Sequence, residues 1–173
     1  MRKLLVINGA SQSSQSLPIN EYVERDIITN RSISDIIVLK QCTYDNILCS
    51  IKDDKPSVII ARSLGAYRLI KILDSYSDFN PFFNSKLERV LLIDPKKPFK
   101  FSEIKTNSQI IKWRVISTYQ KQNNPFKISG LRIKGVYNLK QINCDHSSIN
   151  LTQATFNLIK YAVTVRLVDL FNV

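Results

Sequence analysis

Short, continuous apolar runs alternate along this chain with longer stretches in which apolar residues recur at helical spacing. An apolar run of roughly four to eight residues between turn residues is typical of a strand buried on both faces of a sheet. Such runs occupy residues 3–7, 36–39, 58–61, 90–93 and 115–118, and a weaker one occupies residues 136–142. Helical spacing is found over residues 18–28, 44–51, 65–76 and 148–170.

This alternation predicts a three-layer α/β fold, in which a mostly parallel sheet of about six strands carries helices on both faces. The chain has 173 residues, and 44% of them are hydrophobic. A domain of this length buries roughly 70% of the surface of its unfolded chain, so it needs no metal or disulfide for stability. We therefore expect residues 1–173 to form a single domain.

The final helix has the clearest local pattern. Ser147 or Ser148 can cap its N-terminus. Its apolar residues recur at spacings that place them in one stripe, which predicts a helix packed on the sheet. The stripe consists of Ile149, Phe156, Ile159, Val163, Leu167 and Leu170.

Residues 95–112 and 120–134 follow the fourth and fifth predicted strands. Their prolines and glycines favour loops or short helices. Loops that follow the strands of an open parallel sheet gather at its carboxyl edge, where ligands bind. We expect both segments to surround that edge.

The positive charge of the chain is concentrated in the same region. There are 25 Lys and Arg against 14 Asp and Glu, a net charge of +11. Residues 95–143 hold 11 of the basic side chains and a single acidic one, Glu103. Such a field attracts polyanions. Four lysines, called the basic rim below, are expected at the mouth of the ligand site: Lys96, Lys97, Lys121 and Lys127.

Cysteine content and targeting signals favour an intracellular protein. Cys42, Cys49 and Cys144 are odd in number and lack metal-binding spacing, and His146 is the only histidine. We expect free, mostly buried thiols in a reducing compartment. The apolar run at residues 4–7 is too short for a signal peptide. The chain is therefore predicted to be cytoplasmic.

The candidate chemistry lies where the third predicted strand meets the next helix, in Ala61-Arg62-Ser63-Leu64-Gly65. A serine on such a tight turn needs small residues two positions before and after it, because neighbouring backbone comes very close. Ala61 and Gly65 meet that need. The turn lifts Ser63 Oγ above the sheet, and the Leu64 amide at the helix N-terminus points to where an oxyanion would form. An ordinary turn with a capping serine is the alternative on this pattern alone.

His146 lies after the last predicted strand and before the last helix, so we expect it at the same carboxyl edge. A lone histidine is more often structural than catalytic. Here it follows the serine in the chain order Ser, acid, His that one hydrolase fold uses, which favours a catalytic role.

In these features the chain resembles the α/β-hydrolase family, specifically its small lipase-like and esterase-like members without a lid. The resemblance runs in order from the first strand to the last helix, and it implies a minimal α/β-hydrolase fold with Ser63 as nucleophile and His146 as general base. It also implies an oxyanion hole from the N–H groups of Leu64 and of a residue in the loop after the first strand, Gly9 or Ala10. The matching motifs are the elbow at residues 61–65, where alanine replaces the first glycine of G-x-S-x-G, the strand end Leu91-Leu92-Ile93-Asp94-Pro95, and Asp145-His146-Ser147-Ser148-Ile149.

The acid of the triad is absent from the position that most family members use, because residues 119–125 contain no carboxylate. Some lipase-like members place it after the preceding strand, which here gives Asp94. We expect Asp94 to orient His146, with Asn123 as the alternative, since Asp145 is poorly placed to hold its own neighbour in the chain. An Asp-Pro pair at this strand end also occurs in the family without a catalytic duty.

These residues predict a hydrolase of carboxylic esters or thioesters that forms an acyl-enzyme on Ser63. The expected partner is a small or lipid-like acyl substrate, and the basic rim favours an anionic one or an anionic membrane surface. A second hypothesis is a hydrolase-like protein that binds through its basic loops without turnover. Nucleic-acid binding is least favoured, because no recognised binding motif accompanies the charge. No cofactor or metal is expected, since the chain lacks a Walker lysine loop and G-x-G-x-x-G.

Overall fold

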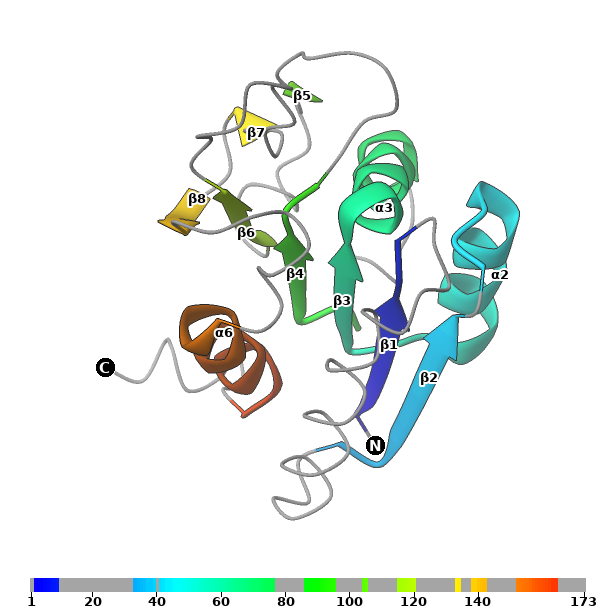
Figure 1. Cartoon of the computed structure of the whole chain (residues 1–173). Coiled ribbons are helices and arrows are strands. Elements are labelled where there is room, and N and C mark those ends of the chain that lie inside the picture. The colour runs from blue at the N-terminus through cyan, green and yellow to red at the C-terminus, as the bar shows by residue number, and fades with distance from the viewer. Residues whose placement is uncertain are drawn as a thin grey trace.

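A computed structural model of the chain describes residues 2–9, 33–39, 41–76, 86–95, 104–105, 115–120, 133–134, 138–142 and 152–164. Within these residues, parallel strands form a sheet on which helices pack (Figure 1). The predicted α/β fold, with a parallel sheet and helices, is thus confirmed.

Four apolar strands lie side by side in the sheet, with β2 at its edge. The strand β1 (Lys3–Ile7) pairs on one side with β2 (Asp35–Leu39) and on the other with β3 (Val58–Arg62). The next strand, β4 (Arg89–Ile93), pairs with β3, and all three pairings are parallel. Every residue of β3 and β4 is buried, as expected for strands covered on both faces.

Next to β4 in the sheet lies β6 (Val115–Gln120), followed by β8 (Asn138–Ile142). The spatial order of the strands is β2-β1-β3-β4-β6-β8. From β1 the chain first adds β2 on one side and then returns to add β3 and β4 on the other. The strand order therefore reverses between β1 and β3. In open parallel sheets, ligands bind outside the carboxyl ends of the strands at such a reversal.

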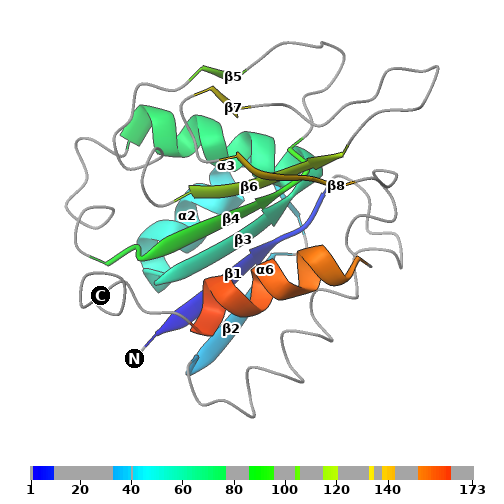
Figure 2. The ribbon, with the colours of Figure 1, turned by 90° about the vertical axis from the view of Figure 1, so that its left-hand side faces the viewer.

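Helices cover the two faces of the sheet. The helices α2 (Tyr44–Asp54) and α3 (Ser63–Tyr76) pack on one face, and α6 (Gln153–Thr164) packs on the other (Figure 2). Side chains alternate between the faces along each strand. In β1, for example, Leu5 joins the apolar cluster under α2 and α3, whereas Leu4 joins the cluster under α6.

The described part of α6 begins one residue after Thr152. The Thr155 N–H donates a hydrogen bond to Thr152 Oγ1 at 3.2 Å, which closes the first turn as an N-cap does. Of the predicted apolar stripe, Ile159 and Val163 are buried, whereas Phe156 is half-buried. The other stripe residues and both predicted capping serines lie outside the described residues.

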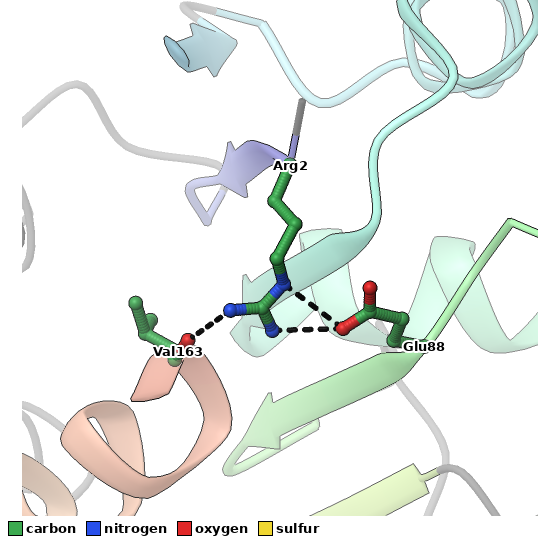
Figure 3. Close-up of polar contacts among 3 residues, drawn as sticks. All are labelled: Arg2, Glu88 and Val163. Carbon is green, nitrogen blue, oxygen red and sulfur yellow. Dashed lines mark hydrogen bonds and ion pairs between the residues drawn. The ribbon is translucent and has the colours of Figure 1, made fainter. Parts of the chain in front are cut away.

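The Arg2 side chain links β1, β4 and α6 at the amino edge of the sheet (Figure 3). Its Nε donates to Glu88 Oε2 at 2.9 Å, and a second guanidinium nitrogen lies 2.8 Å from the same oxygen. A third nitrogen donates to the Val163 carbonyl at 2.7 Å. Since Arg2 precedes β1, Glu88 precedes β4 and Val163 lies in the last turn of α6, one side chain fixes the helix to the sheet.

Several predicted boundaries differ from those of the structure. The helix predicted from residue 44 extends to Asp54, and the next one starts at Ser63 instead of Gly65. Two short strands, β5 (Ile104–Lys105) and β7 (Ile133–Lys134), pair in parallel within segments expected to be loops or short helices. The helix predicted at residues 18–28 lies outside the described residues.

None of the helices in the described part of the chain combines the length and apolar character needed to cross a membrane.

Cys42 is buried and Cys49 is exposed, and both thiols are free. Of the thiols expected to be free and mostly buried, Cys49 is thus the exposed one, on the outer side of α2, while Cys144 is outside the described residues.

Candidate active site

Ser63 stands at the junction of β3 and α3 with no residue between the two elements. β3 ends at Arg62, and α3 begins at Ser63. The φ angle of Ser63 is 51°. A residue with a Cβ rarely adopts this left-handed conformation, because its Cβ crowds the adjacent carbonyl oxygen. Such strain costs roughly 1–3 kcal/mol and persists only where the surrounding structure holds it in place, which is commonly at functional sites.

Gly65 allows the start of α3 to lie against the end of β1. A Cβ built on Gly65 would lie 2.4 Å from the Asn8 carbonyl oxygen and 2.7 Å from Ile7 Cγ2. Both distances are far below van der Waals contact, and the first involves backbone, so only glycine fits. The small residue that the sequence predicts two positions after Ser63 is therefore a steric requirement of this turn.

Gly9 brings the loop after β1 next to the Ser63 side chain. A Cβ built on Gly9 would lie 3.2 Å from Ser63 Cβ and 3.6 Å from Ser63 Oγ. In the preceding residue, Asn8, the side-chain Oδ1 is buried and has no hydrogen-bond partner. The loop predicted to supply an oxyanion N–H thus passes directly beside the serine, at the reversal of strand order.

The backbone N–H of Leu64 belongs to the first turn of α3, a helix of 14 residues. The first four N–H groups of a helix have no carbonyl partner within it, and its dipole is positive at that end. No acidic side chain occupies this first turn. A developing negative charge beside Ser63 would therefore lie at the positive end of the α3 dipole.

Asp94 directly follows β4, the neighbour of β3. Its side chain is fully buried, with 0% exposure, and its φ is 45°. Because β3 and β4 pair in parallel with Arg62 opposite Ile93, their carboxyl ends lie at the same edge of the sheet. Ser63 and Asp94 are thus the residues that follow two paired strand ends, and both have left-handed backbone.

Arg62 is a site feature that the sequence analysis missed. It is the last residue of an otherwise apolar strand and only 7% exposed. Burial lowers the pKa of its guanidinium, and the charge of Asp94 acts in the opposite direction. The sequence contains a signal for Arg62, because a charged residue that directly follows the apolar run Val58-Ile59-Ile60-Ala61 and precedes Ser63 is expected at the site.

The other predicted site residues lie outside the described residues. These are His146, Asn123, Ala10 and the four lysines of the basic rim. What the structure brings together is Ser63, the loop at Gly9, the helix start at Leu64, and the pair of buried charges on Arg62 and Asp94.

No metal centre is formed by the described residues, among which no three His, Cys, Asp or Glu side chains gather. Comparison of the chain with protein-family models, with curated proteins and with solved structures found no match.

Proposed function

We propose that this protein is a serine hydrolase of the α/β-hydrolase type that cleaves carboxylic esters or thioesters. The observation that carries the proposal is the left-handed backbone of Ser63 at a strand-to-helix junction. A serine that only capped the helix would have extended backbone, as Thr43 has before α2 with φ −66° and ψ 158°. The conformation of Ser63 is therefore the one expected of a nucleophile on a tight elbow.

The proposed reaction uses the residues around this elbow. Ser63 Oγ attacks the acyl carbonyl while His146 accepts its proton, and the carbonyl oxygen becomes an oxyanion bound by the N–H of Leu64 and one from the loop at Gly9 or Ala10. His146 then donates the proton to the leaving alcohol or thiol, and an ester between Ser63 and the acyl group remains. Water, deprotonated by His146, hydrolyses that ester and restores the serine.

The finer fold and the substrate class belong to the same proposal. In it, β6 and β8 complete a six-stranded hydrolase sheet, and Asp94 orients His146 from the end of β4, with Asn123 as the alternative. The basic rim steers an anionic ester, an acyl carrier or an anionic membrane surface toward the serine. Free thiols at Cys42 and Cys49 are compatible with the cytoplasm as the location.

Labelling with a fluorophosphonate tests the proposal most directly. The reagent phosphonylates a serine only where an oxyanion hole and a base activate it, so the wild type is expected to take one label on Ser63. The Ser63→Ala variant is expected to take none. Mass spectrometry of the labelled peptide identifies the site.

A panel of p-nitrophenyl esters and acyl thioesters then gives the substrate class, with Ser63→Ala as the blank. Equal hydrolysis by wild type and Ser63→Ala would contradict the proposal. So would a folded wild type that takes no label while its denatured digest contains unmodified Ser63.

A second candidate function, binding on a hydrolase scaffold without turnover, is favoured by one observation. Residues 104–144 contain no Asp or Glu at all, so the usual region for a triad acid has none. This candidate predicts that Ser63→Ala leaves binding to anionic vesicles unchanged, whereas Lys96→Glu combined with Lys97→Glu abolishes it. Vesicle co-sedimentation measures both.

A further inference from the structure

Arg62 carries a charge in a place where charges are rarely tolerated. The residue before Ser63 is 7% exposed, and the four residues before it in β3 are 0% exposed. Arginine is almost never buried to this extent unless an opposite charge compensates it, because removing its hydration is costly. A buried guanidinium at this position therefore requires an anion close by.

Asp94 is the described residue that fits this requirement. The β3–β4 register places Arg62 opposite Ile93, so Asp94 is one residue beyond Arg62 at the same edge of the sheet. It is 0% exposed, and a carboxylate buried so completely has the same need for an opposite charge. The Asp94 charge raises the pKa of Arg62 against the larger lowering caused by burial, so the two groups interact electrostatically.

On the basis of the proposed hydrolase function, we propose that Arg62 is a positioning residue of the Ser63 site: its buried guanidinium holds the Asp94 carboxylate in place beside the elbow.

The backbone explains why this position is suited to that role. Arg62 is joined directly to Ser63, and both Ser63 and Asp94 have left-handed backbone, with φ of 51° and 45°. A charge interaction between Arg62 and Asp94 therefore fixes two strained strand ends relative to each other. A displacement of about 1 Å within a reacting site can cost on the order of 10²-fold in rate. Arg62 thus acts on the reaction through Asp94, without touching the substrate.

A double-mutant cycle tests the proposal. The variants are Arg62→Met, which removes the charge at similar length, Asp94→Asn, and the two combined. We expect Arg62→Met to slow fluorophosphonate labelling of Ser63 by on the order of 10²-fold, and Arg62→Lys to recover part of that rate. The double variant is expected to label no more slowly than Asp94→Asn alone. The loss of unfolding stability should likewise be smaller in the double variant than the two single losses added together.

Arg89 provides a matched control. It is also a nearly buried arginine, 4% exposed, but it begins β4 at the opposite edge of the sheet and stacks on Tyr161, 4.5 Å from the ring centroid. Arg89→Met should lower stability and leave the labelling rate of folded protein at the wild-type value. If Arg62→Met fails to fold, Arg62→Gln replaces it in the same cycle, because glutamine also removes the charge and keeps a polar side chain.

The outcomes separate this inference from the proposed function. A labelled wild type whose Arg62 and Asp94 variants have additive effects overturns the positioning role alone, as does wild-type labelling of folded Arg62→Met. A folded wild type that takes no label overturns the proposed function and with it any role in the reaction. The stability cycle still shows in that case whether the two charges are coupled.

Discussion

Three residues with a Cβ have left-handed backbone in the described part of the chain: Lys55, Ser63 and Asp94. Lys55 has an ordinary explanation, because it is the exposed C-cap of α2 and left-handed residues commonly end helices. Ser63 and Asp94 lack that explanation, since each follows a fully buried strand at the carboxyl edge. Positive φ therefore indicates a functional site only in combination with its position in the fold.

The close approach at Gly65 leads to a prediction about stability. Gly65→Ala places a methyl group where the Asn8 carbonyl oxygen lies 2.4 Å away, so α3 must shift from β1. Overpacking of this kind costs about 1–3 kcal/mol. Urea denaturation should show a lower midpoint for Gly65→Ala, and an unchanged midpoint would contradict the close approach of α3 to Asn8.

Gly9→Ala adds the same methyl group as Gly65→Ala, but it tests the reactivity of Ser63 and not mainly the stability of the fold. The added methyl would lie 3.2 Å from Ser63 Cβ, so the backbone there must shift by a few tenths of an ångström, whereas its 3.6 Å distance from Ser63 Oγ is ordinary contact. We expect a smaller change in stability than for Gly65→Ala, with slower labelling of Ser63, because the methyl group restricts the Oγ.

At the scale of elements, the two edges of the sheet hold different kinds of contact. The carboxyl edge holds Ser63 and Asp94, whereas the amino edge holds the contacts that fix α6 to the sheet. Only the latter depend on Arg2, whose side chain is 10% exposed. Stability and chemistry are therefore expected to respond to different substitutions.

Arg2→Met tests this separation. It removes the contacts to Glu88 and to the Val163 carbonyl, and hydrogen bonds of charged groups are each worth roughly 1.5–3 kcal/mol. With some loss to solvent screening, unfolding stability should fall by about 2 kcal/mol. Glu88→Gln should cost less, since it keeps an oxygen acceptor. Labelling of folded Arg2→Met at a rate far below wild type would contradict the separation.

At the scale of the whole molecule, the order of elements along the chain predicts where the net charge of +11 is concentrated. Its excess lies in residues 95–143, which follow β4 and include β6 and β8. Carboxyl ends of parallel strands share one edge, so a charge excess in the connections beyond them is expected around Ser63. In the proposed function, this charge acts on the association of an anionic substrate with the protein.

Replacing the four lysines of the basic rim by glutamine is expected to lower kcat/KM for anionic esters about tenfold at low ionic strength and to flatten its salt dependence. Neutral esters should be affected little. Steady-state kinetics over a salt series measures both.

The control removes the same charge from elsewhere on the surface. It replaces four exposed lysines by glutamine: Lys52, Lys55, Lys86 and Lys160. If this variant loses as much activity toward anionic esters as the rim variant, the effect is one of net charge, and the rim has no special position.

The sequence predicted the strands β1, β2, β3 and β4 well, because each is an apolar run that is too short for a helix and is bounded by polar residues. β1 matches residues 3–7 at both ends, and β3 extends beyond the apolar run only by Arg62. Periodicity was less informative at helix ends. Ser63 was expected just before its helix, yet α3 begins with it, because the tight junction leaves no room for an extended cap.

By itself, the sequence determined which segments are buried, that strands and helices alternate, and that a serine with small neighbours lies between one strand and the next helix. These properties depend on local composition and spacing. The tertiary structure alone decided that β1 and β3 are neighbours. As a consequence, Gly9 lies close to Ser63, and Gly65 lies close to Asn8. It also decided that Arg62 and Asp94 share one edge, because strand register and burial, unlike hydrophobic spacing, arise from contacts between residues far apart in the chain.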